Sequence, residues 1–417
     1  MSDACAQPGL LTVAEARARL VGAAPLPVRT DYVSLAAAHG RVLAAPQRAL
    51  VDVPPAENSA MDGYALRIAD LRAAAGSLPV SQRIPAGSVP APLQPGSAAR
   101  IFTGAPLPAG ADAVLMQEDC REQDGLLQAD AAAVAALRPG VNIRVRGEDI
   151  VAGREVLAAG TRLGPAQLGV LAAAGIAAVP VYAPLRVAFF STGDELLEPG
   201  EEPQPGRIYN SNRYALRACL ERADCVAIDL GVVVDDRAAT IAALRAAAAR
   251  ADLVITTGGA SVGEEDHLRA ALLACGAVDL WKVAIKPGKP LLFGRVDDAR
   301  GPVPLLGLPG NPVSVAVTFL VLALPLLRAM QGMPGWQPLS FRLPAAFAVQ
   351  RPAGREEYLR VRLVAGTNGP CLERHPNQGS GVLTSMAWAD GLARVPAGST
   401  LAAGDPVEFL PFSSLLG

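Results

Sequence analysis

The sequence predicts a multidomain α/β plus β protein organised around a doubly wound, largely parallel sheet. Short apolar runs alternate with helical patterns over residues 185–331, a Pro- and Gly-rich segment occupies 51–145, and short alternating segments fill 332–417. Alternating strands and helices are typical of a parallel sheet covered by helices on both faces. The chain has 417 residues, which is more than one hydrophobic core usually holds.

The first domain is expected to be helical and to combine residues 1–50 with 146–184. The stretch LTVAEARARLVGAA has apolar residues at helical spacing, and Thr12 with Glu15 has the form of a capping box. The stretch TRLGPAQLGVLAAAG returns to a helical pattern and ends in a glycine that suits a helix C-terminus. We expect the two helical pieces to pack together, with residues 51–145 inserted between them as a β module.

The central domain, residues 185–331, has the most regular pattern. Runs such as LRVAFF, CVAIDLGVV and DLVITT indicate strands, and helical patterns follow each of them. The longest apolar stretch, Val315–Leu327, is shorter than the roughly 18 residues that span a bilayer, so it predicts a buried helix. Residues 332–417 predict a small C-terminal β barrel.

Composition and charge exclude several classes of protein. Lys and Arg total 37 and Asp and Glu total 39, so a net charge of −2 gives no basic surface for nucleic acid or membrane. The six cysteines are scattered, without the spacing of a zinc site or a disulfide framework. The N-terminal MSDACAQPGL lacks the pattern of a secretory signal. We therefore expect a cytoplasmic protein with free thiols.

Five loops define the candidate site. In a doubly wound sheet, ligands bind beyond the carboxyl ends of the strands, so the residues after each apolar run are expected at one edge. All five loops carry glycine, hydroxyl, carboxylate or lysine side chains. They are STGDEL (191–196), Asp235-Asp236, GGASVGEEDH (258–267), KPGKP (286–290) and GNPVS (310–314).

Two of these loops have the composition of an anion cradle. Gly258 and Gly259 let the backbone approach a ligand, and the start of the next helix offers N–H groups. The Asn-Pro of GNPVS suits a helix start, and Ser261 and Ser314 add hydroxyl donors. The alternative is that both loops are only sharp turns. Neither is GxGxxG or GxxxxGK[ST], so the usual dinucleotide and P-loop sites are excluded.

The lysines are concentrated at one place. Only three of the 37 basic residues are lysines, and Lys282, Lys286 and Lys289 all lie in WKVAIKPGK. Because Lys and Arg differ in shape and hydration, this pattern indicates a need for compact ammonium groups, with chance clustering as the alternative. The Pro-Gly turn should direct Lys286 and Lys289 at one anion. Lys282 should lie roughly 13 Å back along its strand, at about 3.3 Å per residue.

Carboxylates are predicted at the same edge. They repel a phosphate unless a cation intervenes, and Mg²⁺ is commonly held by one or two carboxylates plus substrate phosphates. A preference for acidic residues at a helix start is the alternative; it suits Glu264 and Glu265 well and Asp236 less well. The sequence does not separate Asp235 from Asp236. The carboxylates are Asp194, Glu195, Asp235, Asp236, Glu264, Glu265 and Asp266.

Eight segments occur here in the order seen in the molybdopterin molybdenumtransferases, the MoeA family, which includes the E domain of gephyrin. The chain resembles this family from about residue 10 to its end, most weakly in the last domain, through YLRV and NQGSG. Ala260 and His267 stand where Val and Tyr are more usual. The eight segments are NSAMDGYAL, IFTGAPLPAGADAVLMQED, RGEDI, STGDEL, the Asp-Asp pair, TTGGASVGEEDH, KPGKPLLFG and LPGNPVS.

The resemblance implies a reaction and an assembly. The enzyme would take adenylylated molybdopterin and molybdate, hydrolyse the phosphoanhydride with Mg²⁺, release AMP and leave molybdenum on the dithiolene. It would be a homodimer of four-subdomain chains with a shared cleft: a helical linker and dimerisation domain, the β module, an α/β molybdopterin-binding domain and the C-terminal β barrel. Transient contact with other cofactor-biosynthesis and acceptor proteins is implied, and no nucleic-acid or membrane partner.

Motif by motif, the resemblance also implies the site residues. The catalytic set is Asp62, Thr103, Asp149, Glu195, Asp236 and Asp266, and the candidate metal ligands are Glu195, Asp236 and Asp266. The substrate-binding set is Ser191, Gly258, Gly259, Ser261, Gly263, Lys286, Lys289, Pro309, Gly310, Asn311, Ser314, Arg360 and Ser380. Which carboxylates contact Mg²⁺ and which position molybdate or water is left open.

Two other functions are considered. Molybdopterin adenylyltransferases share the TTGG loop but consist of the α/β domain alone, so the long segments on either side of that domain argue against this function. A non-catalytic scaffold, as gephyrin is at synapses, is the second alternative. The intact site carboxylates argue against it.

Overall fold

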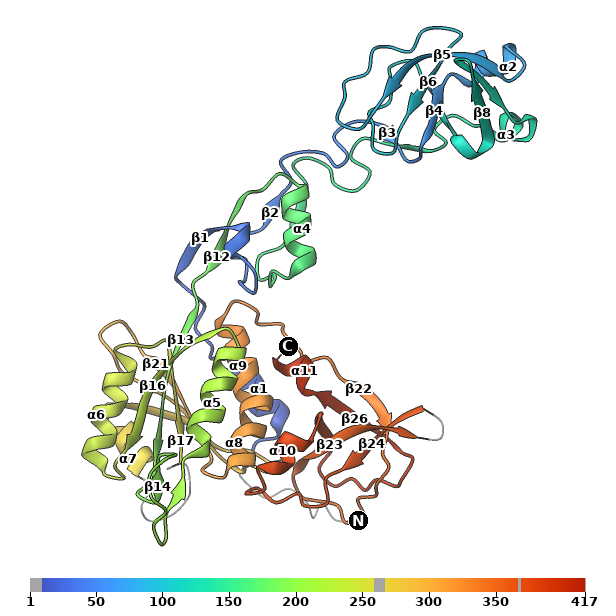
Figure 1. The fold of residues 1–417 in the computed structure, drawn as a ribbon. Coiled ribbons are helices and arrows are strands. Elements are labelled where there is room, and N and C mark those ends of the chain that lie inside the picture. Colours follow the sequence, from blue (N-terminus) through green and yellow to red (C-terminus); the bar gives the residue numbers. More distant parts are fainter. Residues whose placement is uncertain (1–9, 259–266, 367–368, 417) are drawn as a thin grey trace. The chain divides into compact units, whose positions relative to one another are not determined.

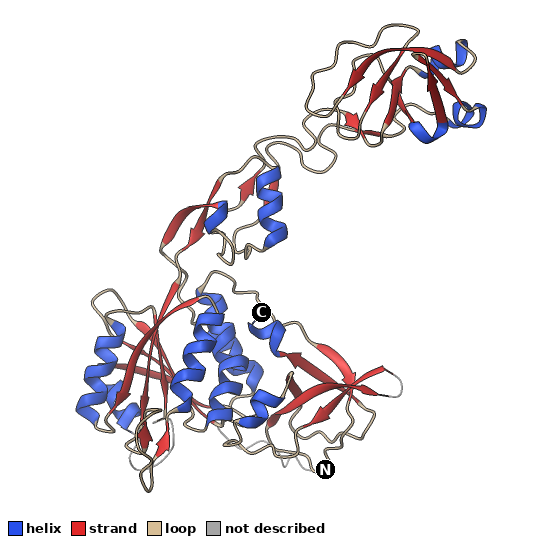
Figure 2. Ribbon diagram, viewed as in Figure 1, coloured by secondary structure: helices blue, strands red, loops and turns tan. Residues whose placement is uncertain are grey.

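A computed structural model describes residues 10–258, 267–366 and 369–416. The chain forms two compact units, one of Met1–Asp31 with Tyr182–Gly417 and one of Tyr32–Val181. The larger unit holds a central α/β domain and a C-terminal β-rich domain, and the smaller one holds the β module (Figures 1 and 2). The chain passes from one unit to the other in β1 (Thr30–Ser34) and β12 (Ala178–Tyr182), which pair with each other.

A six-stranded sheet, ordered β16-β13-β17-β21-β20-β18, forms the centre of the larger unit. The first four strands are parallel, and β20 is antiparallel to both β21 and β18. Because β20 is antiparallel to β21 and β18 is antiparallel to β20, β18 runs in the same direction as the parallel strands. Its carboxyl end therefore lies at the same edge of the sheet as the carboxyl ends of those strands. The strands are β13 (Leu185–Thr192), β16 (Cys225–Val233), β17 (Leu253–Thr257), β18 (Gly276–Lys282), β20 (Pro290–Val296) and β21 (Val303–Leu308).

Alternate strand residues face two helical layers. Val187 and Phe189 pack in one hydrophobic cluster, and Ala188 and Phe190 pack in another on the opposite face. Burial of both faces explains why these strands are continuous apolar runs, and the doubly wound prediction is confirmed. One layer holds α1 (Val13–Gly22), α5 (Ser211–Arg222), α8 (Pro312–Thr318) and α9 (Leu324–Met330); the other holds α6 (Arg237–Ala248) and α7 (His267–Cys275).

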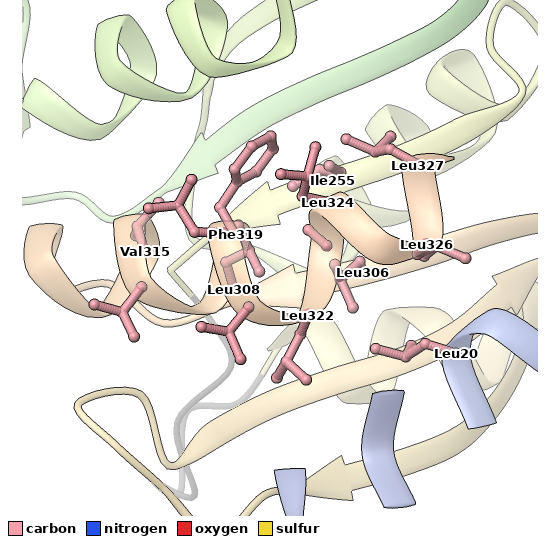
Figure 3. Packing of buried hydrophobic residues seen from close by; sticks show 14 of the residues in the cluster. Leu20, Ile255, Leu306, Leu308, Val315, Phe319, Leu322, Leu324, Leu326 and Leu327 are labelled. Atoms are coloured by element: carbon pink, nitrogen blue, oxygen red, sulfur yellow. The ribbon is translucent and has the colours of Figure 1, made fainter. Parts of the chain in front are cut away.

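The apolar stretch at Val315–Leu327 lies at the centre of the larger cluster (Figure 3). It runs from α8 through a π-helical segment, η3 (Phe319–Ala323), into α9. The whole span Pro312–Met330 is long and apolar enough to cross a membrane by length and composition alone, but 94% of its most apolar window is buried inside the protein. It is therefore the buried core helix that the sequence predicts.

The C-terminal domain is a second sheet, ordered β19-β23-β25-β26-β22, with β24 on β23. Its strand β19 comes from the α/β segment and pairs in parallel with β23, so the two domains are joined by backbone hydrogen bonding. The elements are β19 (Ile285–Lys286), β22 (Phe341–Pro344), β23 (Glu356–Gly366), β24 (Gly369–Arg374), α10 (Thr384–Trp388), β25 (Gly391–Val395), β26 (Pro406–Pro411) and α11 (Phe412–Leu416).

The smaller unit is built on a six-stranded sheet ordered β7-β4-β6-β5-β9-β8. Two strand pairs, β10-β3 and β11-β2, and helix α4 complete it. The elements are β2 (Gln47–Arg48), β3 (Asn58–Ser59), β4 (Gly63–Leu66), α2 (Ile68–Ala73), β5 (Ser77–Ile84), β6 (Ala98–Ile101), β7 (Ala113–Met116), β8 (Cys120–Gln123), β9 (Leu126–Ala129), α3 (Ala131–Ala136), β10 (Ile143–Arg144), β11 (Glu155–Leu157) and α4 (Pro165–Ala173).

The two N-terminal helical patterns form helices that belong to different compact units, α1 to the larger unit and α4 to the smaller one. Helix α1 begins with the predicted capping box, in which the Thr12 Oγ1 accepts from the Glu15 N–H at 3.1 Å and the Glu15 carboxylate accepts from the Thr12 N–H at 2.8 Å. Its apolar face, including Leu20, joins the core of the α/β domain. Leu171 of α4 belongs to a separate cluster in the smaller unit. The expected pairing of these helices and the four domain boundaries stay predictions.

Candidate functional site

A cavity of about 970 Å³ opens at the carboxyl edge of the central sheet, beside the C-terminal domain. Each of the five predicted loops contributes to its lining, through Glu195, Asp235, Gly258, Lys289 and Asn311 among others. The convergence follows from the topology, because parallel strands end at one edge and β18 ends there too.

Two glycines let the chain fold this closely around the cavity. Gly258 has φ +86°, and a Cβ there would collide with the carbonyl oxygen of Thr192. Gly288 has φ +110°, and a Cβ there would collide with the side chain of Thr318 in the buried helix. Both positions combine a left-handed backbone with no room for a side chain, so only glycine fits.

Lys286 and Lys289 both line the cavity, on either side of the Pro-Gly turn. The Lys286 Nζ lies 2.5 Å from the Glu357 Oε1, and Glu357 is only 8% exposed. The two residues are partners in the β19-β23 pairing, so a buried carboxylate holds this ammonium group at the cavity. An ammonium has three donors, which leaves capacity for an anionic ligand. Lys282, at the end of β18, is not among the described residues of the lining.

Two buried polar atoms at the cavity have no hydrogen-bond partner among the described residues. They are the Thr192 Oγ1 and the Asn210 Nδ2, and both residues line the cavity. The Asn210 Oδ1 accepts from the Arg213 N–H at 3.2 Å and so caps α5, which fixes the side chain. A buried polar group without a partner is costly, so these two atoms are suited to bind a ligand. Sequence reasoning missed Asn210; its signal was an asparagine directly before the pattern of α5.

Glu195 and Asp235 are the carboxylates in the described lining of the cavity. Among the described residues, no three His, Cys, Asp or Glu side chains are grouped so that they could hold a metal ion. Two carboxylates in the same cavity lining as the unpartnered Thr192 hydroxyl nevertheless fit Mg²⁺, which takes its other ligands from water and substrate phosphates.

The structure distinguishes Asp235 from Asp236. The Asp236 Oδ2 accepts from the Ala239 N–H at 2.8 Å and caps α6. That backbone donor holds the pKa of Asp236 below its usual value. The Asp236 carboxylate is thus engaged by the helix start, whereas Asp235 lines the cavity, and the expectation that Asp236 serves the cleft stays a prediction.

Arg360 lies behind the cavity. It is 1% exposed, and its guanidinium donates to the Ser385 hydroxyl at 3.1 Å and to the carbonyls of Tyr358 and Gly379 at 3.3 Å. Burial lowers the pKa of Arg360 to about 10. Arg360 holds the backbone of Gly379, which lines the cavity, and its expected substrate contact stays a prediction.

The C-terminal domain contributes other residues directly. Arg355, Gln378 and Ser380 line the cavity, and Arg355 and Gln378 were missed by sequence reasoning. The Arg355 guanidinium donates to the Ile285 carbonyl at 3.2 Å, and the Val313 N–H donates to the Ser380 carbonyl at 3.0 Å. These bonds tie the C-terminal domain to the lysine loop and to the start of α8.

The other predicted residues fall into four groups. Pro309, Gly310, Asn311 and Ser314 line the cavity together with the residues above. Ser191 is buried behind it, with its hydroxyl 2.9 Å from the Thr257 hydroxyl. Gly259, Ser261, Gly263 and Asp266 lie outside the described residues. Asp62, Thr103 and Asp149 belong to the smaller unit.

In the smaller unit, Asp62 and Thr103 form a hydrogen-bonded pair. The Asp62 Oδ1 accepts from both the Thr103 N–H and the Thr103 hydroxyl at 2.7 Å. The backbone donor, followed by the hydroxyl, lowers the pKa of Asp62, which therefore stays ionised at neutral pH. Asp149 is exposed, and its N–H donates to the Val53 carbonyl at 2.9 Å.

Comparisons with known proteins agree with this architecture. Residues 11–175 match the MoeA N-terminal region (domain I and II), 188–329 match the domain described as "Probable molybdopterin binding domain", and 342–412 match the MoeA C-terminal region (domain IV). The chain is 39% identical to the molybdopterin molybdenumtransferase of Haemophilus influenzae over 98% of this chain and 100% of that one.

Two further relatives extend the comparison. The molybdopterin molybdenumtransferase of Nostoc is also 39% identical, over 89% of this chain and 86% of that one. The crystal structure of the molybdopterin biosynthesis MoeA protein of Pyrococcus horikoshii superposes with a TM-score of 0.80 at 28% identity, covering 96% of this chain and all of that one.

The fold and the cavity thus define a multidomain protein whose α/β domain is of the molybdopterin-binding type. The chain belongs to the MoeA family, and the resemblance drawn from its sequence motifs is confirmed over nearly its whole length.

Proposed function

We propose that this chain is a molybdopterin molybdenumtransferase of molybdenum cofactor biosynthesis. It takes adenylylated molybdopterin and molybdate, hydrolyses the adenylyl phosphoanhydride and releases AMP. The observation that best supports this is the meeting of five sheet-edge loops, with two lysines, two carboxylates and unpartnered buried donors, around one cavity of about 970 Å³. Such a cavity suits a large anionic substrate with a polar ring system.

The chain's own residues would bind and orient the reactants. Lys286 and Lys289 stabilise the negative charge that develops on phosphate or molybdate oxygens, and Asn210 donates from its unpartnered amide. Glu195 and Asp235 would hold Mg²⁺, which neutralises phosphate charge when bound. In the hydrolysis, a water oxygen bonds to phosphorus, the anhydride P–O bond breaks, and the water proton passes to a carboxylate or to solvent.

Anaerobic incubation with adenylylated molybdopterin, molybdate and Mg²⁺ tests this function by following AMP release. We expect release that depends on both molybdate and Mg²⁺ and that Lys289→Ala weakens. Incubation with molybdopterin and ATP tests the alternative, because AMP transfer onto the pterin would identify an adenylyltransferase. Matches to the MoeA N-terminal and C-terminal regions on both sides of the α/β domain favour the transferase.

We further propose a cytoplasmic homodimer whose cleft combines the Asp62–Thr103 pair of one chain with the cavity of the other. The support is that the predicted catalytic residues are divided between two compact units. In a mixture of Asp62→Ala and Glu195→Ala chains, each homodimer has two broken sites, whereas a mixed dimer regains one intact site. No recovery of activity after verified subunit exchange, or a fully active monomer by light scattering, would contradict the shared cleft.

A further inference from the structure

The β module carries a second cluster of chemically active side chains, outside the cavity of the larger unit. We call it the arginine face, and define it as Tyr64 of β4, Arg83 of β5, Arg100 of β6 and Phe102, which directly follows β6. The three strands β4, β5 and β6 are labelled in Figure 1. A hollow of about 430 Å³ lies at this face. It is lined by Arg83, Arg100 and Phe102, by residues 80–82 of β5 and by Glu122.

Strand register brings the two arginines together. Arg83 and Arg100 are direct partners in the parallel pairing of β5 with β6, and Tyr64 is the partner of Arg100 in the pairing of β4 with β6. Like charges placed directly opposite each other on neighbouring strands destabilise a sheet. Repulsion between the two cations is therefore a cost to the fold, and an anion bound between them would remove it.

Aromatic rings hold both guanidinium groups in place. The Cζ atoms of Arg83 and Arg100 each lie 4.8 Å from the centre of the Phe102 ring, and that of Arg100 lies 5.0 Å from the Tyr64 ring. A guanidinium stacked on aromatic rings is fixed in orientation while its N–H edge stays available.

The hydrogen-bond donors of the two arginines are used differently. Arg100 donates to the Gly63 carbonyl at 3.3 Å and to the Gln117 side chain at 2.6 Å. Within the described part of the chain, the side chain of the exposed Arg83 makes no hydrogen bond or ion pair and stacks on the Phe102 ring. Its five donors are therefore available to a ligand.

The single carboxylate of the hollow does not pair with either arginine among the described ion pairs. The Glu122 Oε2 accepts from the Tyr64 hydroxyl at 2.7 Å. Burial, together with this acceptor, raises the pKa of Tyr64 to about 12. The phenol thus stays protonated and keeps the Glu122 carboxylate engaged.

The arginine face adjoins the Asp62–Thr103 pair. Thr103 follows Phe102 in the chain, and Asp62 precedes Gly63, whose carbonyl Arg100 binds. The pKa of Asp62, lowered chiefly by the Thr103 backbone donor, is lowered further by the charge of Arg100. A ligand on the arginine face would therefore sit next to a carboxylate that we assign to catalysis.

We propose that the arginine face binds the phosphate of a nucleoside monophosphate, with Arg83 as its principal ligand. This rests on the proposed function, in which AMP is the nucleotide product, and it gives the AMP half of the substrate a site of its own on the β module. A guanidinium suits phosphate because its planar fork donates two parallel hydrogen bonds.

The test measures binding of labelled AMP to the full-length chain by equilibrium dialysis, with competition by inorganic phosphate and by adenosine. Loss of a charge-assisted contact of about 1.5–3 kcal/mol predicts a roughly ten- to hundredfold weaker affinity in Arg83→Gln. Arg121→Gln, an exposed arginine on β8 of the same module, is the matched control and should bind AMP normally. Lys289→Ala distinguishes AMP bound in the cavity of the larger unit from AMP bound on the arginine face, because this substitution should weaken binding in the cavity alone.

Competition by phosphate but not by adenosine alone is expected. Equal AMP affinity in Arg83→Gln and the unmodified chain, or competition by adenosine alone as strong as by AMP, would overturn the proposal. The two proposals fail separately. AMP binding that depends on Arg83 without molybdate-dependent AMP release would refute only the proposed function, and normal AMP release and AMP affinity in Arg83→Gln would refute only the nucleotide site.

Discussion

The cavity of the larger unit and the Asp62–Thr103 region of the smaller unit differ in how they are built. Around the cavity, polar groups such as Asn210 and Thr192 are buried, and Gly258 and Gly288 leave no space for a side chain. In the β module, Thr103 and Arg83 are exposed on a loop and a strand. The first region is preorganised by packing, whereas the second is open to solvent, so that under our proposal a ligand or another protein surface would have to cover it.

The strongest expected effect tests this difference in packing. Gly288→Ala combines a left-handed backbone with a collision against the core helix, so it should lower the free energy of unfolding of the larger unit by about 2–5 kcal/mol. Gly104→Ala, beside Thr103, has φ +80° and no atom within 4 Å of the added Cβ, so it should cost only about 1–2 kcal/mol.

Urea unfolding can separate these two substitutions. The three tryptophans, Trp281, Trp336 and Trp388, all belong to the larger unit, so their fluorescence reports on that unit alone, while far-ultraviolet circular dichroism reports on both. Equal losses of stability for the two glycines would mean that the cavity is no more tightly packed than the module.

The lysine loop provides the next largest effect. Lys286→Ala or Lys289→Ala should each reduce AMP release by about ten- to hundredfold, because a charge-assisted contact of about 1.5–3 kcal/mol is lost. Arg at either position should rescue poorly, since its planar fork differs from a compact ammonium. Lys282→Arg is the matched control and should be nearly silent. If all three Arg variants release AMP at the normal rate, the clustering of lysines is accidental.

The adjacent residues Asp235 and Asp236 allow a comparison between a carboxylate that lines the cavity and one that caps a helix. Asp235→Asn should slow AMP release by about tenfold, the equivalent of one weakened charged contact of about 1.4 kcal/mol. Asp236→Asn should be nearly silent, because asparagine also caps a helix well. A larger loss of rate in Asp236→Asn than in Asp235→Asn would reverse our assignment of the two residues.

The smallest effect is in acid stability. The Ala239 N–H lowers the folded-state pKa of Asp236, so the ionised cap stabilises α6 fully above the unfolded-state pKa, about 3.9. That stabilisation is lost as the pH falls through the lower, folded-state pKa. Asp236→Asn should therefore flatten the pH dependence of urea unfolding below about pH 4. An unchanged acid profile would show that the cap contributes nothing measurable.

The sequence by itself determined the features that depend on local periodicity and turn chemistry. Apolar runs marked the strands of the central sheet, because strands buried on both faces contain few polar residues. The spacing of Thr12 and Glu15 predicted the capping box, and the length of the apolar stretch Val315–Leu327 predicted a buried helix. Once the sheet was known to be parallel, strand direction alone brought the five loops to one edge.

Tertiary structure alone decided which side chains reach the cavity. The pairing of β19 with β23 joins residues about 70 positions apart, and it buries Glu357 against Lys286, places Arg355 at the cavity and leaves Arg360 behind it. The local sequence pattern also did not predict that α1 packs on the α/β core. Helical or strand periodicity predicts that a residue is buried, but it does not predict which distant part of the chain packs against that residue.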